Sequence, residues 1–230
     1  MAEDRKALRL LKVIGQLLYN LQVVGEQNIP EKGACVIAWN HIAPFVDGLT
    51  IGTFLERRPD CVTFGGHRLV ARSRRREIQK GMRQQDSPLL AAFKARGLSA
   101  GELLKALRWL KEGHAVALAV EGETTWDGRL QMPLAPGAAW MGLRTYVPVV
   151  PMVLIGGYDI HPRWKRTPNL SGKVTIRVGK PFLLCDQPLE KVTDADIASA
   201  NQRIYDEMAH LLALGHLTEQ HPFIQGDPTT

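Results

Sequence analysis

A histidine and two carboxylates stand directly after apolar runs in this sequence. Asn40 and His41 end the apolar stretch VIAWNH, and Asp47 follows six positions after His41. A histidine can remove a proton near neutral pH, and a carboxylate can hold its other ring nitrogen. Glu121 comes directly after the apolar run at 114–120. These residues predict general-base chemistry, with an ordinary loop that happens to contain a histidine and an aspartate as the alternative.

Alternating strand-like and helix-like segments would bring these residues to one edge of a sheet. Buried strands are predicted at 34–39, 61–66, 114–120 and 147–157, and a half-exposed strand at 173–179. Helices are predicted at 46–58, 101–112, 137–146 and about 194–213. This order predicts a single α/β domain with a mostly parallel central sheet flanked by helices. Reactive groups gather beyond the carboxyl ends of strands in such sheets, so we expect His41 and Glu121 to share a site.

The chain begins with a predicted amphipathic helix. Apolar side chains recur at helical spacing through 4–22, at positions 7, 10, 11, 14, 17, 18 and 21. Four basic residues lie off this stripe: Arg5, Lys6, Arg9 and Lys12. Such a helix packs on the protein's own core in most globular proteins, and it can also lie on an anionic membrane. We therefore expect an N-terminal helix at 1–22, a main domain at 23–216 and a tail at 217–230.

The composition predicts a folded protein of a reducing compartment. The chain has 230 residues, of which 45% are hydrophobic and 23% charged, enough for one hydrophobic core. Its three cysteines, Cys35, Cys61 and Cys185, have neither metal-ligand spacing nor a disulfide framework. No apolar run approaches the roughly 18 residues of a spanning helix. We expect a cytoplasmic protein, peripheral on the inner face of a membrane.

Basic residues are concentrated between positions 67 and 83. The run HRLVARSRRREIQKGMR contains seven Arg or Lys and one Glu, in a chain of net charge +6. We expect this run to contact an anion, such as a donor phosphate, an acidic carrier protein or lipid headgroups, unless it is only a solvated face. The candidate contacts are Arg68, Arg72, Arg74, Arg75 and Arg76. Aromatic residues do not alternate with the basic ones as stacking platforms would, so nucleic acid is not an expected partner.

Several blocks of the sequence, in order, resemble a known enzyme family. VVGEQNIPEKGACVIAWNHIAPFVDGL is followed by VEGETTWDGRLQMPLAPGAAWMG and then by VPVVPMVLIG, with a less clear middle block around Arg96. Together these blocks resemble the PlsC-type glycerolipid acyltransferases, which include the 1-acylglycerol-3-phosphate and lysophospholipid acyltransferases. The resemblance covers about residues 23–157 and marks the chain as a divergent member. It implies the family's α/β fold and an acyltransferase domain at 23–216.

The resemblance also implies a reaction. A fatty acyl group would pass from acyl-CoA or acyl carrier protein to a hydroxyl of a lysophospholipid-like or other lipid acceptor. His41 would be the base, Asp47 its partner, and neither a cofactor nor a metal nor a covalent acyl-enzyme would be needed. The implied substrate contacts are Asn40, Arg96, Glu121, Gly122, Glu123 and Thr124. The implied partners are the acyl donor, the lipid acceptor and an anionic membrane surface.

Three departures from the family pattern bear on the substrate. One more residue than usual separates His41 from Asp47, and Val120 stands where a proline is usual. Glu123 and Thr124 stand where the family has Thr-Arg, and in the family that arginine helps to hold the acceptor phosphate. The resemblance therefore leaves open whether the acceptor of this protein bears a phosphate.

Two other classes of protein remain as alternatives. GLSAG at 97–101 matches the G-x-S-x-G turn of serine hydrolases, with Ser99 as nucleophile. The other triad members would be Asp127 or Asp159, and His161. The segment before Ser99 favours a helix, and Glu102 completes a capping box with Ser99, which favours a helix cap. A non-catalytic acyl- or lipid-binding relative is the second alternative, and the presence of His41, Asp47 and Glu121 argues against it.

Overall fold

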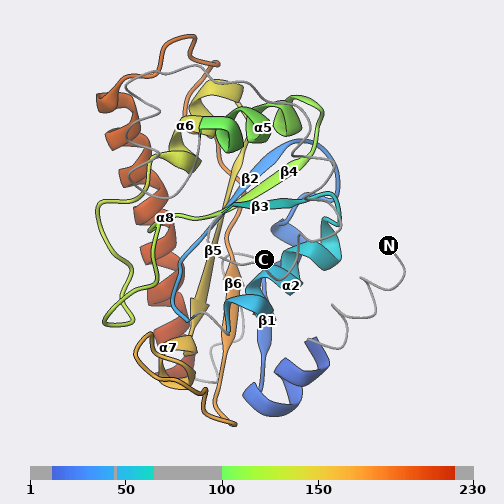
Figure 1. Ribbon diagram of the computed structural model, residues 1–230, viewed down its shortest axis with the longest axis vertical. Helices are drawn as coiled ribbons and strands as arrows, with labels where there is room; N and C mark the ends of the chain where they lie inside the picture. Colours follow the sequence, from blue (N-terminus) through green and yellow to red (C-terminus); the bar gives the residue numbers. More distant parts are fainter. Residues whose placement is uncertain (1–11, 44–45, 65–99, 221–230) are drawn as a thin grey trace.

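The computed structural model describes residues 12–43, 46–64 and 100–220. Their core is a six-stranded sheet with the order β1-β6-β5-β2-β4-β3 (Figure 1). The strands are β1 Gln22–Val24, β2 Cys35–Trp39, β3 Val62–Phe64, β4 Ala115–Ala119, β5 Val149–Ile155 and β6 Thr175–Val178. All neighbouring pairs are parallel except β5 and β6, which are antiparallel. The predicted α/β domain with a mostly parallel sheet is therefore confirmed.

Helices cover both faces of this sheet. They are a helix at 12–19, η1 Glu26–Asn28, α2 Asp47–Arg57, α5 Ala100–Lys111, α6 Gly137–Thr145, α7 Gly157–Ile160 and α8 Asp194–Gln220. Figure 1 shows α5, α6 and the long α8 on one side of the strands and α2 on the other. The sheet is thus the middle layer of three, which explains why its strands read as continuous apolar runs.

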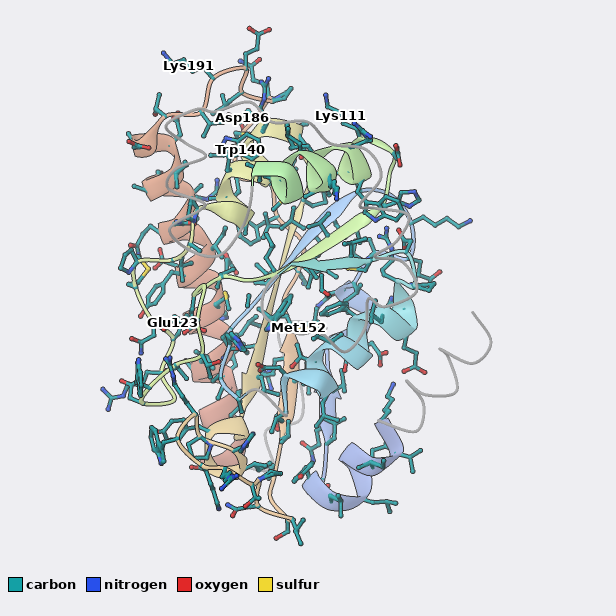
Figure 2. The ribbon with its side chains drawn as sticks, in the orientation of Figure 1. Lys111, Glu123, Trp140, Met152, Asp186 and Lys191 are labelled. Atoms are coloured by element: carbon teal, nitrogen blue, oxygen red, sulfur yellow. The ribbon has the colours of Figure 1, made fainter. Side chains whose placement is uncertain are left out.

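The alternation of side chains along the central strand divides the core into two clusters. All five residues of β2 are buried. Val36 and Ala38 pack with side chains of α5, α6 and α8. Ile37 and Trp39 point to the opposite face and pack with α2, where the Trp39 and Phe54 rings lie 5.6 Å apart. Figure 2 shows Met152 of β5 in the middle of the molecule, where it belongs to this second cluster.

The register of β2 and β4 fixes where the candidate residues lie. Trp39 at the end of β2 pairs with Ala119 at the end of β4, and the N–H of Val120 donates to the Trp39 carbonyl at 2.9 Å. Both strands run in the same direction, so the residues that follow them leave the sheet at the same edge. His41 and Glu121 therefore begin neighbouring loops.

Three sequence predictions differ from the structure. The strand predicted as half-exposed at 173–179 is β6, and all four of its residues are buried because it lies between β1 and β5 under α8. The short β1 was not predicted. The last helix continues to Gln220 beyond its predicted end near 213, and Gly215 within it packs where a Cβ would come within 2.2 Å of Ile155. A glycine at that helix position permits the close approach to β5.

The described part of the N-terminal helix ends at residue 19, before the predicted end at 22, and it is only partly packed. The helix at 12–19 ends before Asn20, whose φ is positive at 39°. Tyr19 is buried against the core, whereas Leu17 and Leu18 of the predicted apolar stripe are 79% and 41% exposed. Residues 1–11 lie outside the described part of the chain.

Candidate active site

The side chain of Asn40 hydrogen-bonds the end of β2 to the neighbouring strand β5. Its side chain is completely buried, its Nδ2 donates to the Leu154 carbonyl at 3.1 Å, and its Oδ1 accepts from the Leu154 N–H at 2.8 Å. The amide thus continues the ladder between β2 and β5 by one residue beyond the end of β2. Asn40 was predicted as a substrate contact, and its amide faces the backbone of β5 in this structure.

His41 and Asp47 form a hydrogen-bonded pair at the start of α2. The ring Nδ1 of His41 contacts Oδ2 of Asp47, and the other carboxylate oxygen lies 3.4 Å from the N–H of Ala43. The Asp47 side chain is 1% exposed and that of His41 13%. Asp47 is also the first residue of α2, where the partial positive charge of a helix N-terminus favours an anionic side chain. The loop between the two residues therefore doubles back as the pairing requires.

Thr124 completes a line of three side chains. Its Oγ1 lies 3.1 Å from Nε2 of His41, on the opposite side of the ring from Asp47. A carboxylate only accepts hydrogen bonds, so in the neutral ring Nδ1 carries the proton and the Nε2 lone pair accepts from the threonine hydroxyl. The next residue, Thr125, donates its N–H to the His41 carbonyl at 2.9 Å. The loop after β4 is thereby tied to His41 at two points.

Glu121 holds the loops on both sides of the histidine through backbone contacts. One carboxylate oxygen accepts from the N–H of His41 at 2.5 Å, and the other accepts from the N–H of Gln131 at 2.9 Å. The side chain is buried, and burial raises the pKa of Glu121 to about 7, although both hydrogen bonds act to lower it. Glu121 thus positions His41 through the main chain, because both carboxylate oxygens accept from backbone N–H groups.

Turn-forming residues shape the loop that follows Glu121. Gly122 has a φ of +78°, a conformation that side chains with a Cβ rarely adopt. The hydroxyl of Thr125 donates to Oδ1 of Asp127, which also accepts from the Arg129 N–H. The amide of Gln131 donates to the same carboxylate oxygen at 2.8 Å. These local bonds hold Thr124 where it meets His41.

Glu123 and Arg163 lie on the outer side of this loop. Nη1 of Arg163 donates to Glu123 at 3.2 Å and to the Thr124 carbonyl at 2.9 Å, and its guanidinium lies 3.7 Å from the centre of the Trp126 ring. Figure 2 shows Glu123 on the loop between β4 and α6, away from the central sheet. The sequence interpretation did not single out Arg163. The usable signal was its position in the loop after the strand predicted at 147–157, at the same sheet edge.

Several predicted site residues lie outside the described residues. They are Arg68, Arg72, Arg74, Arg75, Arg76, Arg96 and Ser99. The other members of the alternative hydrolase triad are described and have contacts elsewhere. Nε2 of His161 lies 3.0 Å from the Lys165 carbonyl, and Asp127 is held within its own turn. Within the described residues, the three groups that do line up are Asp47, His41 and Thr124.

Neither a metal site nor a membrane span is present in the part of the chain that the structure describes. Within residues 12–43, 46–64 and 100–220, His, Cys, Asp and Glu do not gather in groups that could hold a metal ion. None of the helices over those same ranges has the length and apolar character needed to cross a bilayer. A shallow pocket lies at the same sheet edge beyond β5, lined by Ile155, Asp159, Asn169 and Lys173.

The fold and site define a layered α/β domain with a buried His-Asp pair at the carboxyl edge of its sheet. Residues 20–155 match the Acyltransferase family, which is more than half of the chain, and the chain belongs to that family. A chloroplastic 1-acyl-sn-glycerol-3-phosphate acyltransferase of Brassica napus is 32% identical over 99 residues. That match covers 40% of this chain and only 28% of the plant protein.

A solved structure supports the fold over most of the chain. The crystal structure of the 1-acyl-sn-glycerophosphate acyltransferase PlsC from Thermotoga maritima is similar with a TM-score of 0.59. The similarity covers 93% of this chain and 82% of that one, at 18% sequence identity. The predicted resemblance to PlsC-type acyltransferases is thereby confirmed for family and fold.

Proposed function

We propose that this protein is an O-acyltransferase that moves a fatty acyl group from a thioester to a hydroxyl of a lysophospholipid-like acceptor. One observation carries the proposal. The His41 ring is held between the Asp47 carboxylate and a hydroxyl, that of Thr124, which lies 3.1 Å from Nε2. A hydroxyl at this distance occupies the place that an acceptor hydroxyl needs for general-base catalysis.

In the reaction, the acceptor hydroxyl replaces the Thr124 hydroxyl at Nε2 of His41. His41 takes the proton of the acceptor hydroxyl at Nε2 while the hydroxyl oxygen forms a bond to the thioester carbonyl carbon. The carbon–sulfur bond then breaks, and the leaving thiolate takes the proton from the imidazolium. Asp47 stabilises the charged ring and keeps Nε2 unprotonated beforehand. Because a thioester is already reactive, a base and correct positioning supply most of the catalysis.

The donor and the location of the protein are further parts of the proposal. The family membership supports a fatty acyl thioester as donor, carried by coenzyme A or acyl carrier protein. Exposed apolar side chains support peripheral attachment to an anionic membrane. They are Leu17, Leu18, Trp126, Trp164 and Leu170. Exposed tryptophans and leucines can insert into the interfacial region of a membrane.

A transfer assay tests this function. The purified 230-residue chain is incubated with labelled acyl-CoA or labelled acyl carrier protein and a panel of lysophospholipids and simple lipid alcohols. An ester product that depends on acceptor supports the proposal and identifies the donor. Release of free fatty acid at the same rate with and without every acceptor would contradict it.

The contact between Thr124 and His41 also favours a second candidate, a thioester hydrolase with a covalent intermediate. In that reaction the Thr124 oxygen would attack the thioester, the thiol would leave, and water would later cleave the threonine ester.

Thr124→Val separates the two functions because it removes the hydroxyl and keeps the shape of the side chain. General-base transfer predicts that the Thr124→Val protein keeps transfer within about tenfold. The covalent route predicts an acylated wild-type protein by intact mass and complete loss of turnover in the variant.

A further inference from the structure

A cation from a third loop lies beside the residue that touches the base. Arg163 follows α7, which itself follows β5, and it reaches the loop after β4. Its Nη1 donates to the Thr124 carbonyl at 2.9 Å, while the Thr124 hydroxyl lies 3.1 Å from Nε2 of His41. A single residue therefore joins the guanidinium to the base. Two hydrogen bonds and one residue span at most about 10 Å.

The surroundings of Arg163 fix the plane of the guanidinium and leave part of its edge open. The group lies 3.7 Å from the centre of the Trp126 ring, which restrains it by stacking. Both of its hydrogen bonds with the described residues come from Nη1. The remaining donors, on Nη2 and Nε, form the kind of fork that binds two oxygens of a phosphate. The side chain is 30% exposed, so a ligand can reach it.

Glu123 is the other partner of this cation, and it is easily displaced. Its Oε2 accepts from Nη1 of Arg163 at 3.2 Å, and its side chain is 67% exposed. Ion pairs this exposed contribute little net stability, because water and salt compensate each partner. A phosphate group carries more negative charge than one carboxylate and accepts in the same geometry. It can therefore replace Glu123 without a large penalty.

We infer that Arg163 is the specificity-determining residue for a phosphate group on the acceptor, and that Glu123 occupies it when the acceptor is absent. The inference rests on the proposed function, in which the acceptor hydroxyl binds at Nε2 of His41. A hydroxyl and a phosphate on neighbouring carbons lie about 5 Å apart, so with one hydrogen bond at each end they can bridge a separation of up to about 10 Å. Arg163 thus contacts Thr124, the residue that stands where the family usually has an arginine.

A binding experiment tests the inference without relying on turnover. The probes are a water-soluble short-chain lysophosphatidate and the monoacylglycerol of the same chain length, measured by calorimetry with the full chain. Arg163→Gln is expected to weaken lysophosphatidate binding roughly 10- to 100-fold and to leave monoacylglycerol binding unchanged. Arg163→Lys keeps the charge without the fork and is expected to recover only part of the loss. Arg166→Gln, an equal loss of charge at an exposed position of the same loop, serves as the control.

The proposed competition between Glu123 and the acceptor phosphate for Arg163 is tested by a second set of variants. Glu123→Gln is expected to tighten lysophosphatidate binding by about two- to fivefold, because the cation is no longer paired. The gain is expected to vanish when Arg163→Gln is added, since the two residues then have no shared partner. If Glu123→Gln still tightened lysophosphatidate binding in the presence of Arg163→Gln, competition between Glu123 and the phosphate for Arg163 would be contradicted.

The outcomes separate this inference from the proposed function. Equal affinity of wild type and Arg163→Gln for lysophosphatidate overturns the inference even if acyl transfer is observed. A loss of coenzyme A binding in Arg163→Gln, with lysophosphatidate binding intact, also overturns it and assigns the cation to the donor. Failure of the proposed function would instead appear as absence of ester product while the Arg163-dependent binding persists.

Discussion

At the scale of single residues, three polar side chains contact three different atoms of His41. Asp47 binds Nδ1, Thr124 binds Nε2, and Glu121 holds the histidine backbone. The types of these residues were visible in the sequence, and His41, Asp47 and Glu121 were selected from it. The separate roles of the two carboxylates could not be predicted, because a sequence does not show which carboxylate contacts a side chain and which contacts the main chain.

The Asp47 carboxylate is expected to control the tautomer of His41. In Asp47→Asn the side-chain amide can donate to Nδ1, which places the ring proton on Nε2 and removes the base. Acyl transfer should fall at least about 100-fold with an unchanged fold, measured as kcat/KM together with the circular dichroism spectrum. Asp159→Asn, an exposed carboxylate on α7, is the matched control and should keep wild-type rates. A variant at position 47 with nearly normal kcat/KM would show that the carboxylate does not orient the base.

Glu121 is expected to make stability depend on pH. Burial raises its pKa from 4.5 to about 7, so between these values the folded protein keeps a proton that the unfolded chain has released. The free energy of unfolding therefore falls as pH rises through this window and levels off above it. Glu121→Gln does not titrate, so wild type should lose on the order of 3 kcal/mol relative to the variant between pH 4.5 and pH 8. Urea unfolding at several pH values measures the difference, and parallel pH profiles would contradict the buried, raised pKa.

At the scale of elements, the sequence predicted most helices and strands because their apolar patterns are long. β2, β4 and β5 lie within their predicted segments, and α2 begins at Asp47 as the helical pattern indicated. The three residues of β1 are too few to produce a period. The burial of β6 depends on its neighbours, β1 and β5, and the order of strands in a sheet is not written in any one segment. Arg163 was not selected, because its place after a strand indicates the sheet edge but not that this strand, β5, lies beside β2.

A buried arginine, Arg58, binds the end of α2 to two neighbouring segments, and we expect it to contribute substantially to the free energy of unfolding. The Arg58 side chain is 1% exposed, and it donates to the Pro30 and Gly33 carbonyls and to both oxygens of Asp60. Its guanidinium lowers the pKa of Asp60 to about 2. Arg58→Met should reduce the free energy of unfolding by about 3 kcal/mol, because Asp60 and two carbonyls lose their partner. Lys111→Met, at an exposed helix end, is the control in the same denaturation experiment. A loss no larger than that of the control would mean that Arg58 contributes little.

At the scale of the whole molecule, the sheet order assembles the site. β5, β2 and β4 are neighbours and parallel, so the loops after them meet at one edge. The loop after β2 supplies His41, the loop after β4 supplies Thr124, and the segment after β5 supplies Arg163. The basic balance of the chain, +6 overall, agrees with anionic donors and acceptors. Family membership could be predicted from the sequence because its blocks lie at these same strand ends.

The most direct test of the account is acyl transfer by His41→Ala. Wild type and variant are compared in a single-turnover assay with a labelled acyl thioester and a lysophospholipid, after circular dichroism has shown that both proteins are folded at the assay temperature. The variant is expected to form ester product at least about 1,000-fold more slowly, because the substitution removes the imidazole that takes the proton of the acceptor hydroxyl. Ester formation by the variant within a few-fold of wild type would contradict the assignment of His41 as the general base.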